Sequence, residues 1–278
     1  MSEATVARMG AVRSLPGVNV MLLGPTGSGK THCIRTLLDH DDIMDVFVLF
    51  TEPGMEVIGD IPCASGLHYH YIPPANTGWA EMIDSAKKIN SLSFEALAKL
   101  PGINKTKYNQ FIEVLETCAD FTCDRCGESF GAVDSWGSDR AFVVDSLSGL
   151  NVMAMDLVVG SKPTKSQADW GVAMDNLERL IQRLCTSTQC HFVLTAHLEP
   201  ERDEVSGRVQ LMASTLGRKL APRLPRFFSD VVLCDRQGSK FVWNTAAGNV
   251  ELKARNLRLS TELEPSFVQI LDHWSKRR

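Results

Sequence analysis

The sequence predicts an α/β fold of the doubly wound type with a mostly parallel sheet, and three observations support this prediction. Short apolar runs rich in Val and Phe recur along the chain, as is typical of strands that are buried on both faces of a parallel sheet. Amphipathic segments of helix length lie between several of these runs. A glycine-rich turn joins the first run to the first helical segment.

Apolar runs bounded by turn residues are the predicted strands. They are Val18–Leu23, Val46–Phe50, Ala141–Val144, His191–Thr195, Asp230–Leu233 and Phe241–Trp243. The clearest helix is Trp170–Cys185, in which apolar residues recur at helical spacing. Near the C-terminus the last strands and the run Val250–Ala254 follow one another closely, which predicts a β-hairpin at an edge of the sheet.

One region does not follow the alternation of strands and helices. Residues from about 75 to 138 contain helical stretches followed by TCADFTCDRCGESFG. This pattern predicts a helical, cysteine-containing insert within a single domain that spans residues 1–278. The polar and turn-rich segment Glu199–Gly207 predicts an exposed hairpin or loop.

The composition is that of an ordinary globular protein, with 44% hydrophobic and 22% charged residues and a net charge of −4. No apolar stretch approaches about 18 residues, and the N-terminus lacks the apolar core of a secretory signal, so we expect no membrane span. The eight cysteines lie mostly in apolar runs, which favours reduced thiols and a cytoplasmic location. Because the net charge is negative, any DNA contact must come from a local basic surface.

The segment GPTGSGKT matches the phosphate-binding pattern G-x-x-x-x-G-K-[ST] in full. It comprises Gly24, Pro25, Thr26, Gly27, Ser28, Gly29, Lys30 and Thr31. It follows a strand and precedes a helix, which is the context that this motif requires. The backbone N–H groups of the loop surround phosphate oxygens, and Lys30 adds a positive charge. Because the hydroxyl of Thr31 is placed to ligate Mg²⁺, the sequence predicts a site for ATP and Mg²⁺.

Two strand ends are expected to complete this site. A phosphate loop needs a nearby carboxylate to hold Mg²⁺, and Asp145 follows four apolar residues in RAFVVDSLSG. The alternative for Asp145 is to cap the next helix. The following strand ends at His197. If this strand lies between the strand before the phosphate loop and the strand before Asp145, His197 could hydrogen-bond to the γ-phosphate. The alternative for His197 is a side chain that faces solvent.

Several motifs together resemble those of the RecA-like ATPases. They are GPTGSGKT, the strand VFVLF ending in TEPG, AFVVDS, FVLTAH and the late LKARN. The chain is similar to ATPases of tailed phages with a RecA core, including single-strand annealing proteins. The resemblance implies a RecA-like fold, ATP hydrolysis, assembly into a homo-oligomeric ring or filament, and a role in DNA recombination, repair or replication. It also implies single-stranded DNA and a single-strand-binding protein as partners, and a host cytoplasm for a phage-encoded chain.

The resemblance also implies roles for individual residues. Glu52, which follows the second core strand, matches the glutamate that polarises the attacking water, and Glu56 ranks second. Ser146 directly follows Asp145, but its hydroxyl is too weak a base to take the place of Glu52. Lys253 and Arg255 in LKARN match a K-x-R motif that reaches the γ-phosphate of a neighbouring subunit. The sequence departs from the family pattern at His197, where RecA has Gln, and in the insert.

In the RecA family, two loops line the DNA channel. One follows the strand that ends at the metal-binding Asp, here Asp145, and the other follows the next strand, which here ends at His197. The first candidate loop is Gly160–Gln167, which contains Lys162 and Lys165. The second is Val205–Phe228, whose cations are Arg208, Arg218, Lys219, Arg223 and Arg226. These cations can bind phosphates without sequence preference, and Trp170, Phe227 and Phe228 can stack on bases. The alternative is a solvated basic face with buried aromatic side chains.

Cys118, Cys123 and Cys126 form a cluster that contains CDRCG, a pattern resembling a zinc knuckle. A structural zinc ion requires four ligands, and only one C-x-x-C is present. Asp120 would be an unusual fourth ligand, so a β-turn that carries reduced thiols remains the alternative. The alternation of apolar and polar residues in LHYHY, residues 67–71, predicts a half-buried strand. The alternative is a metal site at its histidine pair, His68 and His70, but this pair lacks a third ligand.

The leading interpretation is an ATPase that assembles on DNA. One alternative is an ATP-dependent motor, such as a helicase or a packaging ATPase. Another is a DNA-assembly protein that binds ATP with little turnover. A small-molecule kinase would need an Arg-rich lid and an acceptor pocket, and the C-terminal strands with LKARN argue against it.

Overall fold

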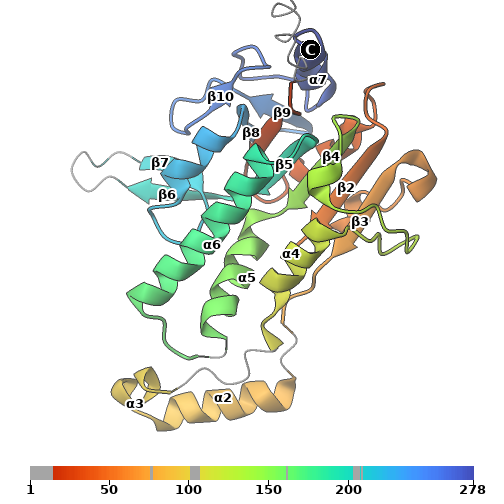
Figure 1. Ribbon diagram of the computed structural model, residues 1–278. Coiled ribbons are helices and arrows are strands. Elements are labelled where there is room, and N and C mark those ends of the chain that lie inside the picture. The colour runs from red at the N-terminus through yellow and green to blue at the C-terminus, as the bar shows by residue number, and fades with distance from the viewer. Residues whose placement is uncertain (1–14, 76–77, 101–106, 161, 203–206, 208) are drawn as a thin grey trace, which may run out of the picture.

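The computed structural model describes residues 15–75, 78–100, 107–160, 162–202, 207 and 209–278. Its centre is an 8-stranded sheet with the order β10-β8-β1-β5-β4-β2-β3, and β9 pairs with β8 (Figure 1). The strands are β1 (Asn19–Leu23), β2 (Asp45–Phe50), β3 (Leu67–Tyr71), β4 (Arg140–Asp145), β5 (His191–Ala196), β8 (Asp230–Gln237), β9 (Lys240–Asn244) and β10 (Lys253–Ala254). All pairs from β8 to β3 are parallel. The doubly wound, mostly parallel α/β fold is therefore confirmed.

Helices cover both faces of the sheet because the strands are apolar on both sides. On one face, Phe47, Phe142 and Phe192 pack under α4, α5 and α6. On the other face, Val48 and Val143 pack against the segment after the glycine-rich turn and against the C-terminal helix. The helices of the described chain are α1 (Lys30–Cys33), α2 (Trp79–Ser91), α3 (Phe94–Ala98), α4 (Gln110–Ala119), α5 (Leu147–Val159), α6 (Gln167–Thr186) and α7 (Val268–Ser275). Every strand predicted from its apolar run and the helix predicted at Trp170–Cys185 are present.

Two hairpins lie beyond the parallel strands. β8 and β9 form an antiparallel hairpin at the sheet edge, and β10 pairs antiparallel with the start of β8, so the C-terminal hairpin edge is confirmed. β6 (Leu198–Arg202) and β7 (Val209–Ala213) form a separate two-stranded sheet directly after β5. The expected exposed hairpin around Glu199–Gly207 therefore exists, although residues 203–206 lie outside the described residues.

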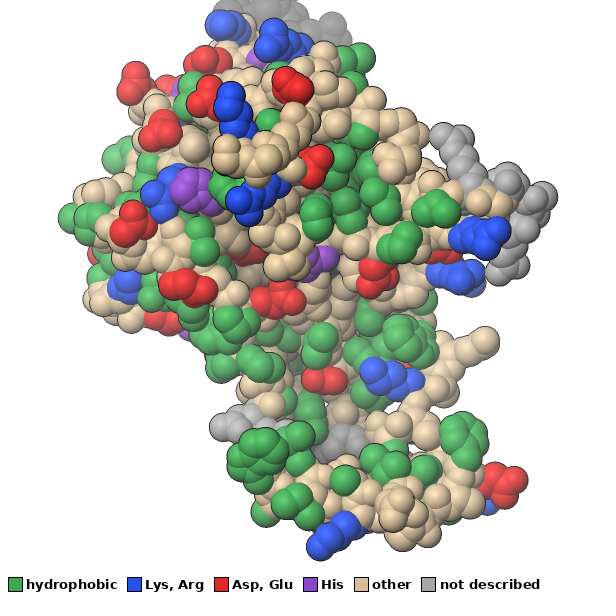
Figure 2. Space-filling view, turned by 180° about the vertical axis from the view of Figure 1, so that it is seen from behind, with side chains coloured by type: hydrophobic (Ala, Val, Ile, Leu, Met, Phe, Trp, Pro, Cys, Tyr) green, Lys and Arg blue, Asp and Glu red, His purple; other side chains and the backbone are tan. Residues whose placement is uncertain are grey.

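The predicted insert lies between the edge strand β3 and the central strand β4. Its first part, α2 and α3, has no buried residue and stands apart from the body (Figures 1 and 2). Its second part does not stand apart, because Phe111 of α4 and the following Phe121 and Trp136 are buried in the main core. The cysteine-rich segment is therefore packed against the sheet.

No described helix combines the length and the apolar character that a membrane crossing requires.

Candidate nucleotide site

The glycine-rich loop lies between the end of β1 and the start of α1. Its backbone needs glycine at two positions for different reasons. A Cβ atom on Gly24 would lie 2.4 Å from the carbonyl oxygen of Cys234 on the neighbouring strand β8. Gly29, which precedes α1, has a φ of 86°, a left-handed conformation that side chains disfavour. The loop therefore wraps tightly at the edge where the parallel strands end.

Lys30 lies inside the loop. Its side chain is buried, and Nζ donates hydrogen bonds to the carbonyl oxygens of Gly24 at 2.8 Å and Pro25 at 2.9 Å. Burial lowers the pKa of Lys30, while nearby acidic groups, Asp145 and Glu52 among them, oppose this shift. The ammonium group is thus held beside the loop by two neutral carbonyl oxygens, which an anion can replace.

Thr31 and Asp145, predicted to share a metal ion, are in direct contact. The hydroxyl of Thr31 donates to Oδ2 of Asp145 at 2.6 Å. Thr195 of β5, which the sequence analysis missed, donates to Oδ1 at 2.5 Å. The signal for Thr195 was a hydroxyl within an otherwise apolar strand. Asp145 does not cap α5, because the side chain of Ser146 performs that role by accepting from the N–H of Ser148 at 3.2 Å.

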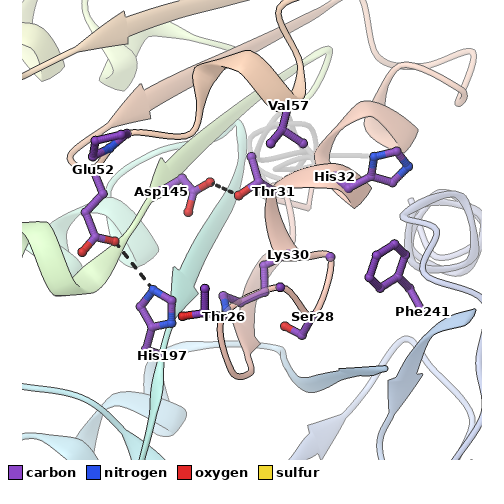
Figure 3. Close-up of a pocket in the computed structure, with 13 residues that line it drawn as sticks. Thr26, Ser28, Lys30, Thr31, His32, Glu52, Val57, Asp145, His197 and Phe241 are labelled. Carbon is purple, nitrogen blue, oxygen red and sulfur yellow. Dashed lines mark hydrogen bonds and ion pairs between the residues drawn. The ribbon is translucent and has the colours of Figure 1, made fainter. Parts of the chain in front are cut away.

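Glu52 and His197 face each other across the opening of this site (Figure 3). Oε2 of Glu52 lies 3.7 Å from Nε2 of His197 and accepts a hydrogen bond from the hydroxyl of Ser146. The end of β2 is joined to the end of β4 as well, since Thr51 Oγ1 accepts from the N–H of Ser146 at 2.9 Å and donates to its carbonyl at 2.7 Å. These contacts hold Glu52 at the rim of the sheet.

A single cleft of about 590 Å³ is lined by Lys30, Thr31, Glu52, Asp145 and His197. The order of the strands explains the convergence, because β5 lies between β1 and β4 and their C-terminal ends meet at one edge. Sequence reasoning missed Val57 and Phe241, which also line the cleft. Phe241 arrives from β9, and its ring lies close to Gly29 and His32. No motif pointed to Val57 or Phe241.

The residues of the cleft fit a nucleotide and a magnesium ion. The buried hydroxyl of Ser28 has no hydrogen-bond partner among the described residues, and a phosphate oxygen would provide one. A carboxylate and a hydroxyl oxygen, those of Asp145 and Thr31, are hard ligands of the kind that Mg²⁺ prefers. Chemically, the cleft can bind a phosphate chain and hold a carboxylate beside its end.

Lys253 and Arg255 are not part of this cleft. Ala254 pairs with Asp230 at the start of β8, and Asp230 in turn lies beside Val20, three residues before the end of β1. Lys253 and Arg255 therefore lie near the N-terminal ends of the parallel strands, whereas the phosphate loop lies at their C-terminal ends. The amine of Lys253 donates to the carbonyl of Phe228 at 2.5 Å, whereas the side chain of Arg255 is exposed.

The prediction that Phe228 can stack on DNA bases is wrong. Phe228 is only 1% exposed and stacks on Phe192 in the core, so it cannot stack on bases. Its apolar ring is taken up by the core because η7 (Ala221–Phe227) packs against α6. Phe227 is half-buried beneath the guanidinium of Arg226.

Several of the predicted basic residues have acidic or aromatic partners. Arg223 and Arg226 both pair with Glu178, at 3.2 Å and 2.6 Å, and Arg218 pairs with Glu201 at 3.1 Å. In the first candidate loop, Lys162 pairs with Asp169, and Lys165 lies over the ring of Trp170. Arg208 lies outside the described residues.

The predicted cysteine cluster is only partly correct. Cys118 belongs to α4 and packs against the main core. Burial raises the pKa of its thiol to about 12, with Asp134 adding to the shift. Cys118 does not join the group of potential ligand atoms that includes Cys123 and Cys126. Helical geometry turns it toward the core, which spacing along the sequence did not reveal.

A family model described as an AAA domain matches residues 17–257. No curated protein sequence matches the chain. Similar solved structures include an ATPase from the type III secretion system of pathogenic bacteria, at 11% identity and a TM-score of 0.40, over 80% of this chain and 53% of that one. The chain thus spans about half the length of that ATPase.

Two further structures are similar. One is the RadB recombinase, at 13% identity and a TM-score of 0.39, over 82% of this chain and 81% of that one. The other is EscN, in complex with its central stalk EscO from enteropathogenic E. coli, at 10% identity and a TM-score of 0.39, over 79% of this chain and 42% of that one. Since the family model covers most of the chain, including the phosphate loop, the chain belongs to the AAA domain family of P-loop ATPases.

Proposed function

We propose that this protein hydrolyses ATP and uses hydrolysis to act on single-stranded DNA, as the resemblance to tailed-phage RecA-core ATPases implies. One observation carries the proposal. Glu52 and His197 lie 3.7 Å apart at the opening of the cleft that also contains Lys30 and the Thr31–Asp145 pair. Binding alone needs only the loop and the metal ligands, so a carboxylate beside the phosphate end favours hydrolysis.

Each residue has a role that follows from its position. The loop N–H groups and Lys30 bind the β- and γ-phosphates. Thr31 and Asp145 would hold Mg²⁺, which neutralises charge on the phosphates when it is bound. Thr195 is a positioning residue, because its hydrogen bond fixes the rotation of the Asp145 carboxylate.

Glu52 orients the attacking water and accepts its proton. The hydroxyl of Ser146 binds one oxygen of this carboxylate and so limits its rotation. His197 can donate a hydrogen bond to the γ-phosphate from the end of β5. Since His197 also faces Glu52, it is able to register whether a phosphate is present and to change the orientation of the base.

The hairpin β6–β7 supports action on a second ligand. It begins at Leu198, the residue after His197, and its end returns to the same point, where Ser214 N donates to the carbonyl of His197 at 2.8 Å. A groove of about 630 Å³ runs beside the hairpin, and its lining includes Trp170, the cations Arg202 and Arg218, and the carboxylates Glu199 and Glu201. A nucleic acid in this groove would find an aromatic ring and cations, and would contact a segment covalently joined to His197.

Action in an oligomer is part of the proposal. Lys253 and Arg255 lie near the sheet edge opposite to the phosphate loop of their own chain. If they contact a phosphate, it is that of a neighbouring subunit in a ring or filament. A cation donated in this way stabilises the charge that develops on the transferred phosphoryl group.

The test is the ATPase rate of the full chain without DNA, with single-stranded DNA and with double-stranded DNA, using Lys30→Ala as the background. We expect hydrolysis above that background and stimulation by single strands. Hydrolysis without any response to DNA would contradict single-stranded DNA as the partner and would still support ATP hydrolysis. ATP binding without hydrolysis would instead favour an assembly protein with little turnover, and stimulation by double strands alone would favour a duplex motor.

A further inference from the structure

Four potential metal ligands converge beside β3 at the far edge of the sheet from β10. Cys63 lies in η4 (Cys63–Ser65), His68 lies on β3, and Cys123 and Cys126 lie in the turn after α4. Their ligand atoms all lie within 4.8 Å of one another. Two of these residues come from each side of the segment that contains α2 and α3, so the fold rather than the sequence spacing brings them together.

We infer that Cys63, His68, Cys123 and Cys126 form a structural zinc site. Sγ of Cys63 lies 3.9 Å from Sγ of Cys123, and Sγ of Cys126 lies 3.8 Å from Nδ1 of His68. In a tetrahedral site with Zn–S of about 2.3 Å and Zn–N of about 2.0–2.1 Å, neighbouring ligand atoms are about 3.5–3.8 Å apart. The two sulfur atoms are too distant for a disulfide, whose S–S bond is about 2.05 Å.

The histidine is oriented for metal binding through Nδ1. Its other nitrogen, Nε2, faces Oδ1 of Asp45 at 3.7 Å. A carboxylate on that side favours the proton on Nε2 and leaves the lone pair of Nδ1 free, as in other carboxylate–histidine–zinc arrangements. His68 is only 5% exposed, and its ring packs against both Phe47 and Phe130, which restricts its rotation.

The turn that carries the two cysteines is attached to β3 by contacts that do not involve the ligand atoms. Arg125 donates to the carbonyl oxygens of Ile61 and Leu67. Asp124 accepts from the N–H of Tyr71 at 2.8 Å and contacts Nδ1 of His70 at 2.7 Å. The site is therefore preformed, and the guanidinium of Arg125 helps to offset the negative charge of a zinc ion bound by three thiolates.

The zinc ion would tie the two ends of the projecting segment together. The chain leaves the sheet after β3, forms α2 and α3, and returns through α4 to Cys123. Because a ligand cluster that closes a long loop restricts the unfolded chain, metal binding stabilises the fold. The thiols lose their protons to solvent on binding. This role is independent of nucleotide hydrolysis.

The first test is the metal content of the full chain, purified under reducing conditions without chelators and measured by elemental mass spectrometry. We expect about one zinc per chain, since the ligands surround one point. Cys126→Ser removes the most exposed ligand and is least disruptive to folding. Cys118→Ser is the matched control, because Cys118 belongs to the same sequence cluster but lies outside the ligand group. Cys126→Ser should hold zinc at least about tenfold more weakly against a chelator, and Cys118→Ser should not.

The second test uses Co²⁺ alone, added to the metal-free wild type. Tetrahedral coordination by thiolates should give intense visible and near-ultraviolet absorption in the wild type and in Cys118→Ser, with a changed spectrum in Cys126→Ser. A wild type that holds no zinc and develops no such spectrum would overturn the inference. Equal loss of metal from Cys118→Ser and Cys126→Ser would also overturn it, as would iron in place of zinc.

Discussion

The hydroxyl of Thr195 donates a hydrogen bond of 2.5 Å to Oδ1 of Asp145. The other carboxylate oxygen is thereby left to Thr31 and to the Mg²⁺ ion that this pair would hold. We expect Thr195→Val to weaken Mg²⁺ binding by about 10–100-fold, the usual cost of losing a partner of a metal ligand. ATPase measured against Mg²⁺ concentration should show the loss at low Mg²⁺ and partial recovery at high Mg²⁺.

Thr188→Val is the matched control for this prediction. Thr188 is also buried, but its hydroxyl donates to the carbonyl of Leu184 at 2.6 Å, away from the cleft. It should leave the Mg²⁺ dependence unchanged. If both variants shift that dependence equally, the contact of Thr195 with Asp145 has no special role.

Glu52→Gln should keep the shape of the side chain and lose its charge. We expect nearly normal binding of ATP and Mg²⁺ with hydrolysis slower by at least about tenfold, the lower side of what acid–base groups contribute. Glu56→Gln is the comparison, since Glu56 lies in η3 (Met55–Val57), is exposed and does not line the cleft. Single-turnover hydrolysis separates the two variants. Wild-type turnover in Glu52→Gln would place the base elsewhere, with Glu56 the next candidate.

Arg255 should act on a neighbouring subunit. The phosphate loop follows Leu23, and Ala254 lies level with Val20 across β8, about 10 Å back along the strand direction at about 3.3 Å per residue. Mixing Arg255→Ala subunits with Lys30→Ala subunits should therefore restore some ATPase, because hybrid interfaces combine an intact loop with an intact Arg255. No recovery in subunits shown to co-assemble would count against action between subunits.

The basic segment should contribute to DNA affinity through each cation that exchanges its acidic partner for a phosphate. Neutralising Arg218, Lys219 and Arg223 together should reduce the slope of the salt dependence of single-strand binding by at most roughly 2, at about 0.7 per phosphate contact. ATPase without DNA should survive. Glu178→Gln is the opposite test, because Glu178 pairs with both Arg223 and Arg226, so its loss should steepen the slope. Binding titrations at several salt concentrations measure both, and unchanged slopes would remove this segment from the DNA surface.

His191 should make stability depend on pH. It is fully buried, accepts from the N–H of Val18 at 3.0 Å and contacts the carbonyl of Ser138 at 3.0 Å. Burial lowers the pKa of His191 from 6.5 to about 4. Between these values the unfolded chain binds a proton that the folded chain does not, so stability is lost as pH falls from about 6.5 toward 4. The loss is at most about 3.5 kcal/mol, at about 1.4 kcal/mol per unit of pKa.

Urea denaturation across this pH range provides the measurement. His191→Gln cannot titrate and should have a flatter profile than the wild type, whereas His273→Gln, which alters an exposed histidine of α7, should keep the wild-type profile. Parallel profiles for the wild type and His191→Gln would show that other groups cause the acid sensitivity.

The sequence by itself determined the features that depend on neighbouring residues. The phosphate loop is eight consecutive residues, and its strand and helix flank it directly. The apolar runs predicted the strands because burial on both faces of a parallel sheet requires them. Asp145 was predicted because an apolar run leads directly into it and a phosphate loop needs a nearby carboxylate. Glu52 was predicted from the resemblance to the RecA-like pattern.

Only the tertiary structure decided which distant side chains touch. Strand register and packing bring Thr195 to Asp145, pair Arg223 and Arg226 with Glu178, and bury Phe228. The same packing turns Cys118 into the core and brings His68 to Cys126 across 58 residues of sequence. Periodicity and motif spacing describe local geometry, whereas these contacts depend on how the helices and strands pack against one another, which no short stretch of sequence encodes.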